Sequence, residues 1–217
     1  MNLEQARTNM IDHQIRSWEV LDGRVLDVLR EVPREEFVPA RHRKLAFSDL
    51  RIPLGHDQVM MKPIEQGRLL QSLALQGQEK LLEVGTGSGF LTACLARLAG
   101  HVTSIEIIES LAEQAHARLG EQGAEDLDLK IGDALEAGFA DGQFDVVVVT
   151  ASIASVPDPI VRWLRPGGRL FIVRGQSPAM EALVVTRTES GRLSEDSLFE
   201  TDLPRLIGAE DPPAFKF

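Results

Sequence analysis

The feature that most constrains the fold is a glycine-rich turn directly after an apolar run. Leu81 to Val84 leads into Gly85 to Gly89, whose letters are GTGSG. Such a run is typical of a buried strand, and glycines allow a backbone to approach a ligand closely. Phe90 to Leu98 has helical spacing, and His101 to Ile107 has the composition of a second strand. The sequence therefore predicts a β-α-β unit with a nucleotide-binding turn.

The residues around this turn indicate which ligand it binds. Glu106 ends the second predicted strand, where a carboxylate about 20 residues after the turn can accept ribose hydroxyls. The dinucleotide pattern is G-x-G-x-x-G, and here the third glycine, Gly89, comes one residue early. Glu83 precedes the turn, and its carboxylate would repel a pyrophosphate but suits the cationic methionine portion of S-adenosylmethionine. We therefore predict S-adenosylmethionine as the cofactor.

The flanking segments predict one α/β unit with an N-terminal extension. Residues 1–63 are expected to form helices and a substrate-facing segment, and residues 64–210 the cofactor-binding sheet, as a single compact unit with 1–63. Apolar residues at helical spacing predict two N-terminal helices, the second capped by Asp22. Residues 211–217 are expected to be a flexible tail.

Alternating elements in the second half predict a parallel sheet wound on both faces. Strands are expected at 127–131, 144–150 and 169–173, with a helix around Pro157 to Leu164. Two further strands, 182–188 and 197–203, are expected to add antiparallel to the sheet across a turn at 189–191.

Four prolines between Pro33 and Pro63 predict a mainly irregular segment over the cofactor site. It contains a basic cluster, Arg41 to Lys44, which is either a solvated helix face or an attractant for a carboxylate-bearing substrate. Trp18 and Trp163 are expected to pack in the core or between helices.

Composition excludes several classes of function. The net charge of -10 argues against DNA or RNA as a partner, because non-specific nucleic-acid binding depends on clustered Lys and Arg. The N-terminus is charged, and the sequence contains no long apolar stretch. We therefore expect no signal peptide and no membrane span, and predict a cytoplasmic protein. Cys94, the single cysteine, is expected to be a small buried apolar residue, and we predict no metal site.

The glycine-rich turn is common to many methyltransferases, whereas two other blocks of this sequence are more particular. These are Val32-Pro33-Arg34-Glu35-Glu36-Phe37-Val38-Pro39 and Ile52-Pro53-Leu54-Gly55-His56-Asp57-Gln58. Together with the turn, these blocks resemble the protein-L-isoaspartate O-methyltransferases. The resemblance implies a doubly wound, mainly parallel, seven-stranded Rossmann-like methyltransferase sheet and methyl transfer to the α-carboxylate of isoaspartyl residues in damaged proteins.

The resemblance also implies a set of site residues. Glu83, Gly85, Gly87 and Ser88 would line the methionine end of the cofactor, Glu106 would hold the ribose, and Gly132 and Asp133 would lie beside the adenine. Asp133 could equally be a turn or N-cap aspartate. The full set expected to bind the cofactor is Glu83, Gly85, Thr86, Gly87, Ser88, Gly89, Glu106, Ile107, Gly132, Asp133 and Thr150.

One segment departs from the family pattern. After Gln58, the family normally has threonine and serine where this chain has Val59 and Met61, and those hydroxyls lie near the acceptor carboxylate. Losing a hydrogen bond to a charged group costs about 1.5 to 3 kcal/mol. Gln58, Val59 and Met61 are therefore the substrate-segment positions of interest, and Lys62 could supply a new contact.

Three hypotheses follow from this departure. The chain is an isoaspartyl methyltransferase that tolerates the altered segment, or a methyltransferase with another acceptor, such as a small molecule or a different carboxylate. The third is a cofactor-binding protein without catalysis, for which the missing hydroxyls are the support.

Overall fold

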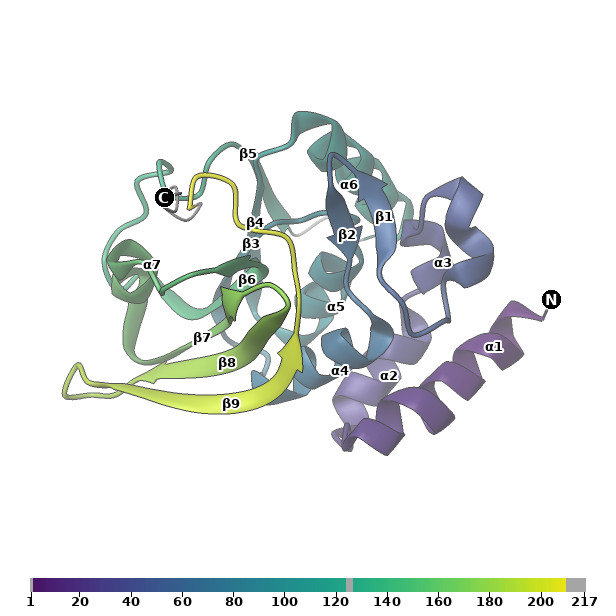
Figure 1. Ribbon diagram of the computed structural model, residues 1–217, viewed down its shortest axis with the longest axis horizontal. Helices are drawn as coiled ribbons and strands as arrows, with labels where there is room; N and C mark the ends of the chain where they lie inside the picture. Colours follow the sequence, from purple (N-terminus) through teal and green to yellow (C-terminus); the bar gives the residue numbers. More distant parts are fainter. Residues whose placement is uncertain (1, 124–126, 210–217) are drawn as a thin grey trace, which may run out of the picture.

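A seven-stranded sheet forms the centre of the molecule (Figure 1), with the strand order β5-β4-β3-β6-β7-β8-β9. The computed structural model describes residues 2–123 and 127–209. The pairings among β5, β4, β3, β6 and β7 are parallel, and β8 and β9 add antiparallel at one edge. The strands are β3 (Lys80–Val84), β4 (His101–Glu106), β5 (Leu127–Ile131), β6 (Phe144–Ile153), β7 (Leu164–Gln176), β8 (Ala179–Arg187) and β9 (Leu193–Thr201). This is the predicted doubly wound sheet.

Alternation along β6 shows why the sheet is covered on both faces. Val146 and Val148 pack into one apolar cluster with α5 (Phe90–Leu98), whereas Val147 and Val149 pack into a second cluster with α7 (Asp158–Trp163). Successive side chains of a strand point to opposite faces, so a run of valines buried on both sides needs helices on both sides. The predicted β-α-β unit is confirmed as β3, α5 and β4, followed by α6 (Glu109–Glu121).

The N-terminal extension packs into the same apolar cluster as α5. It contains α1 (Leu3–Asn9), the π-helical η1 (Met10–Ile15), the 3-10 turn η2 (Arg16–Trp18) and α2 (Gly23–Glu31). The predicted cap is confirmed, because the Asp22 side chain accepts a hydrogen bond from Arg24 N. Trp163 is buried as expected, but the prediction for Trp18 is wrong: it is 50% exposed, because it lies in the last turn before Glu19 reverses the chain at φ 62°.

The segment from Pro33 to Pro63 is more regular than predicted. It contains α3 (Arg34–Phe37), the 3-10 helix η3 (Ala40–Leu45) and an antiparallel hairpin of β1 (Ile52–Gly55) and β2 (Gln58–Met60), and α4 (Pro63–Ser72) follows. The hairpin turn has positive φ at Gly55, His56 and Asp57. His56 and Asp57 are not glycines, so the sequence does not indicate their positive φ and does not predict this hairpin turn.

At the C-terminal side, β7 differs from its predicted bounds. It begins at Leu164 and not at the expected residue 169, because Leu164 already pairs with Phe144. The chain after β9 runs back across the sheet (Figure 1). A parallel bridge joins Ser152 to Arg205. The predicted tail lies outside the described residues. Within the described ranges, no helix is long and apolar enough to cross a bilayer.

Candidate cofactor and acceptor site

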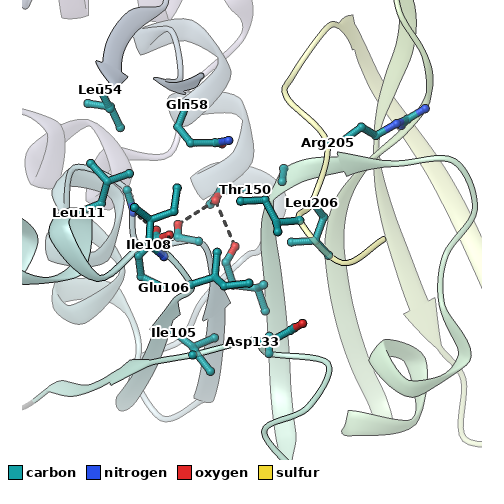
Figure 2. A pocket seen from close by; sticks show the side chains of 18 of the residues that line it. Leu54, Gln58, Ile105, Glu106, Ile108, Leu111, Asp133, Thr150, Arg205 and Leu206 are labelled. Carbon is teal, nitrogen blue, oxygen red and sulfur yellow. Dashed lines mark hydrogen bonds between the residues drawn. The ribbon is translucent and has the colours of Figure 1, made fainter. Parts of the chain in front are cut away.

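A cavity of about 70 Å³, here named the main cavity because most of the predicted cofactor residues line it, lies at the carboxyl ends of the central parallel strands (Figure 2). This is where open α/β sheets bind ligands. The β1–β2 hairpin bounds one side of it, and the segment after β9 bounds the other. Its lining consists of Leu54, Gln58, Val59, Val84, Gly85, Gly87, Ile105 to Ile108, Leu111, Gly132, Asp133, Ala134, Thr150, Ala151 and Arg205 to Ile207. The hairpin segment therefore does lie over the predicted site.

Gly85 is held in a conformation that only glycine adopts easily. Its φ is +94°, and its N–H donates to the carbonyl oxygen of Ile105 at 2.8 Å. A Cβ at this position would overlap the Thr150 hydroxyl. That hydroxyl donates to the carbonyl oxygens of Val84 at 3.1 Å and Gly85 at 2.8 Å, as the dashed lines in Figure 2 mark. Thr150 therefore supports the turn while it lines the cavity.

Glu106 places a carboxylate at the cavity wall. The residue is only 5% exposed, and its two oxygens accept hydrogen bonds from Gly87 N at 2.8 Å and Ile108 N at 3.0 Å. Both contacts involve backbone N–H groups, and no side-chain cation within residues 2–123 and 127–209 pairs with this carboxylate. A carboxylate in this position matches the one expected to hold a ribose.

Glu83, which was expected to line the methionine end, is not among the cavity-lining residues. It is fully buried, because alternation along β3 directs it under α5, where it accepts hydrogen bonds from Thr92 Oγ1 and Ser104 Oγ at 2.6 Å each. Burial raises the pKa of Glu83 to about 7, the hydrogen bonds from Ser104 and Thr92 oppose this, and the charge of Glu106 adds to it. The expected place of Glu83 at the wall of the methionine end is therefore wrong, because the side chain lies behind the turn.

Thr86 connects Glu83 to the turn. Thr86 Oγ1 lies 2.6 Å from Ser104 Oγ, and since Ser104 donates to Glu83, Thr86 donates to Ser104. Gly89 also acts through the backbone: it is the N-cap of α5 with φ +86°, and a Cβ there would press against Ala115. The outline of the turn thus depends on buried groups below it.

The other predicted residues lie at the cavities. Gly132, Asp133 and Ile107 line the main cavity. Asp133 also accepts a hydrogen bond from Leu135 N at 2.8 Å, so its turn role and its place at the cavity coexist. Ser88 lines the smaller cavity described next, and its hydroxyl oxygen accepts from Phe90 N at 3.3 Å.

A smaller cavity of about 40 Å³, here named the hairpin cavity, adjoins the main one. The two share Leu54, Val59, Gly85, Gly87 and Thr150. The remaining lining of the hairpin cavity is Met60, Met61, Gln66, Thr86, Ser88 and Leu91. The three predicted substrate-segment residues therefore meet at this boundary: Gln58 and Val59 line the main cavity, and Val59 and Met61 line the hairpin cavity.

Sequence reasoning missed the contribution of Arg205 to Ile207. Hydrogen bonds at 2.8 Å hold this segment in place, from Ser152 N to Pro204 O and from Leu206 N to Ser152 O. Nothing local in the sequence indicates that this stretch returns to the site. The basic cluster Arg41 to Lys44 lies in η3 and lines neither cavity, and Arg43 pairs with Glu36 at 2.7 Å.

Comparisons with known proteins agree with this architecture. The family described as protein-L-isoaspartate(D-aspartate) O-methyltransferase matches residues 5–203. A protein-L-isoaspartate O-methyltransferase of Rhodopseudomonas palustris is 37% identical over 202 residues, covering 93% of each chain. One from Opitutus terrae is 38% identical and covers 87% of this chain and 83% of its own length.

A solved structure shows the same fold. A Plasmodium falciparum protein, titled as a protein-L-isoaspartate O-methyltransferase in complex with S-adenosyl-L-homocysteine, superposes with a TM-score of 0.77. The superposition covers 95% of this chain and 98% of that one, at 19% sequence identity. This likeness supports the assignment of the fold.

Proposed function

This chain belongs to the protein-L-isoaspartate(D-aspartate) O-methyltransferase family, and we propose that it methylates the α-carboxylate of isoaspartyl residues in damaged proteins or peptides. The methyl donor of this family of enzymes is S-adenosylmethionine. The observation that carries the proposal is the junction of the two cavities. There the glycine-rich turn and Glu106 adjoin the hairpin that carries Gln58, Val59 and Met61.

The residues of the main cavity fit S-adenosylmethionine. Glu106 offers carboxylate oxygens to ribose hydroxyls, and Gly85 leaves room where any side chain would meet Thr150. Ile105, Ile108 and Leu111 supply apolar surface for a base. The bound cofactor supplies an electrophilic methyl group on a sulfonium.

The acceptor needs orientation and not deprotonation. A peptide carboxylate is ionised at neutral pH and is already a nucleophile. In the reaction, a carboxylate oxygen bonds to the methyl carbon while the carbon–sulfur bond breaks, leaving the methyl ester and S-adenosylhomocysteine. The ester then loses methanol as the backbone nitrogen closes a succinimide, which can reopen as aspartate. The role proposed for the hairpin is to hold the carboxylate in line with the sulfonium methyl.

A second candidate rests on the lining at positions 59 and 61. Val59 and Met61 make the hairpin cavity more apolar, which favours an acceptor other than a peptide carboxylate, such as a small apolar or phenolic molecule. A protein that binds the cofactor without turnover would show the same lining. A cytoplasmic location stays a prediction from the sequence.

The test is transfer of labelled methyl groups from S-adenosylmethionine to an isoaspartyl peptide and to its normal aspartyl twin. Base-labile labelling of the isoaspartyl peptide alone is the expected result. Cofactor binding measured by calorimetry accompanies it. Tight cofactor binding with neither peptide labelled would contradict the proposal and direct the search to other acceptors.

A further inference from the structure

A fully buried arginine lies directly behind the hairpin cavity. Arg34, in α3, donates through Nε to Ala46 O at 2.8 Å and through Nη2 to Met61 O at 2.8 Å. Its Nη1 donates to Gln66 Oε1, and its guanidinium lies over the ring of Phe90, 4.9 Å from the centroid. One side chain therefore joins the end of η3, the residue after β2 and α4.

All three acceptors of Arg34 are neutral oxygens. Within the described residues its guanidinium forms no ion pair, and Asp49 and Glu65 act on it only through longer-range attraction. Burial lowers the pKa of Arg34 to about 9, so the group is still a cation at neutral pH. The positive charge behind the cavity is consequently not neutralised by direct contact.

Arg34 determines which way the Gln66 amide faces. A guanidinium can only donate hydrogen bonds, so the amide oxygen of Gln66 must face Arg34 and the NH₂ group must face away from it. Gln66 is 3% exposed and lines the hairpin cavity. Its amide nitrogen makes no hydrogen bond to any residue in the described part of the chain. The arrangement leaves an oriented, unused donor at a cavity whose neighbouring wall is Met61.

We propose that the Gln66 amide donates a hydrogen bond to the α-carboxylate of the acceptor, and that Arg34 is the positioning residue that orients it. This inference rests on the proposed function. The Gln66 amide supplies a polar contact in the hairpin cavity, where the side chains of Val59 and Met61 offer none. The buried cation polarises the amide and adds a favourable potential for an anion.

Two other polar groups nearby are already engaged. The Thr150 hydroxyl proton is directed to backbone carbonyls, and the N–H of Gly87 is directed to Glu106. Ser88 is the remaining hydroxyl of the hairpin cavity. Gln66 is therefore the amide donor of this cavity, and it has a defined orientation. The methionine carboxylate of the cofactor has the same chemistry as the acceptor, so the test must separate the two.

The central comparison is Gln66→Glu against Gln66→Leu in the full-length enzyme. Glutamate keeps the acceptor for Arg34 but replaces the donor with a second oxygen that repels a carboxylate. Leucine removes both contacts. We expect KM for the isoaspartyl peptide to rise about tenfold in Gln66→Leu and further in Gln66→Glu, with the cofactor Kd within about twofold of wild type.

A purely structural role gives the opposite order. If Gln66 only supported Arg34, Gln66→Glu would match wild type and Gln66→Leu would be the damaged variant, and that result would overturn the proposal. So would a fall in cofactor affinity in Gln66→Glu at unchanged peptide KM, because the amide would then serve the methionine carboxylate. Thermal unfolding of both variants checks that each is folded.

Arg34→Lys tests the positioning role separately. Lysine keeps the charge but cannot span the three acceptors, so we expect a higher peptide KM with the cofactor Kd unchanged. The kinetics of the wild type distinguish a failure of the proposed function from a failure of the role assigned to Gln66. A wild type that labels no isoaspartyl peptide overturns both the proposed function and this assignment. A wild type that does, with both Gln66 variants unchanged, overturns the assignment alone.

Discussion

The backbone N–H of Gly87 donates a 2.8 Å hydrogen bond to Oε2 of Glu106, which joins the glycine-rich turn to the end of the neighbouring strand. The other oxygen of the same carboxylate accepts from Ile108 N. Glu106 therefore shapes the turn at the same time as it presents oxygens to the main cavity. A ribose placed there would meet a carboxylate whose orientation is already determined.

Glu106→Ala is expected to weaken S-adenosylmethionine binding at least tenfold. Alanine removes the ribose acceptor and leaves two backbone N–H groups without their partner. Isothermal titration calorimetry measures the change. Glu106→Gln is the matched control: it keeps one oxygen acceptor and the same shape, so we expect a smaller loss. An affinity unchanged in Glu106→Ala would reject the ribose role.

Gly85→Ala is expected to damage cofactor binding and stability together. The new Cβ would overlap Thr150 Oγ1, and a φ of +94° is unfavourable for any side chain, which alone costs on the order of 1 to 3 kcal/mol. Urea unfolding and calorimetry measure the two effects.

Gly191→Ala separates conformational strain from crowding. Gly191 has φ +80° in the turn between β8 and β9, and a Cβ there would meet nothing within 4 Å. We expect a moderate loss of stability and unchanged cofactor affinity. Equal effects of the two substitutions on cofactor affinity would contradict the role given to Gly85.

The β-α-β unit could be predicted because local patterns determine it. The apolar run of β3, the glycines at 85, 87 and 89, and Glu106 all lie within 27 residues, and each acts through its neighbours. The hairpin and the segment at Arg205 to Ile207 could not be predicted in the same way. Their positions depend on long-range contacts, such as that of Ser152 with Pro204, which leave no local pattern in the sequence.

Glu83 shows a further gap between sequence and structure. The motif places an acid two residues before Gly85, but only the register of β3 decides whether that acid faces the cavity or α5. In the sequence, Arg34 stands only within the block from Val32 to Pro39, and nothing there indicates that its side chain is buried. Its contacts to Ala46, Met61 and Gln66 come from three segments, and no spacing rule brings them together.

Val59→Thr combined with Met61→Ser is expected to raise activity on an isoaspartyl peptide. Each new hydroxyl faces the hairpin cavity and can contribute a hydrogen bond to a charged group, worth about 1.5 to 3 kcal/mol or roughly ten- to a hundredfold. Steady-state kinetics with both peptides measure the change. Val59→Ala with Met61→Ala controls for cavity size, and a folded double hydroxyl variant with no gain would mean that other parts of the pocket differ.

The raised pKa of Glu83 predicts that the stability of the folded protein depends on pH in a specific way. Burial raises the pKa of Glu83 to about 7, so between pH 4.5 and 7 the folded protein binds this proton more tightly than the unfolded chain does. The contribution of this group to stability is therefore fully present below pH 4.5 and is lost as the pH rises through 7. Linkage makes this loss roughly 2 to 4 kcal/mol. Glu83→Gln has no such proton, so its stability relative to wild type should increase over the same range.

The measurement is urea unfolding of the cofactor-free protein at several pH values between about 3 and 8, which covers both the acid range and the rise through pH 7. Glu79 provides a control of opposite sign. Burial acts to raise its pKa, but hydrogen bonds from the backbone around Gln76 and Gln78 and the charge of Arg169 lower it overall. Wild type should therefore gain stability relative to Glu79→Gln as the pH rises from acid, because the ionised carboxylate is the form that the fold favours. Parallel stability curves for wild type and Glu83→Gln would contradict the prediction, because the Glu83 carboxyl would then have the same pKa in the folded and unfolded chains. The buried hydrogen bonds of Thr92, Ser104 and Thr86 would in that case not depend on the charge of Glu83.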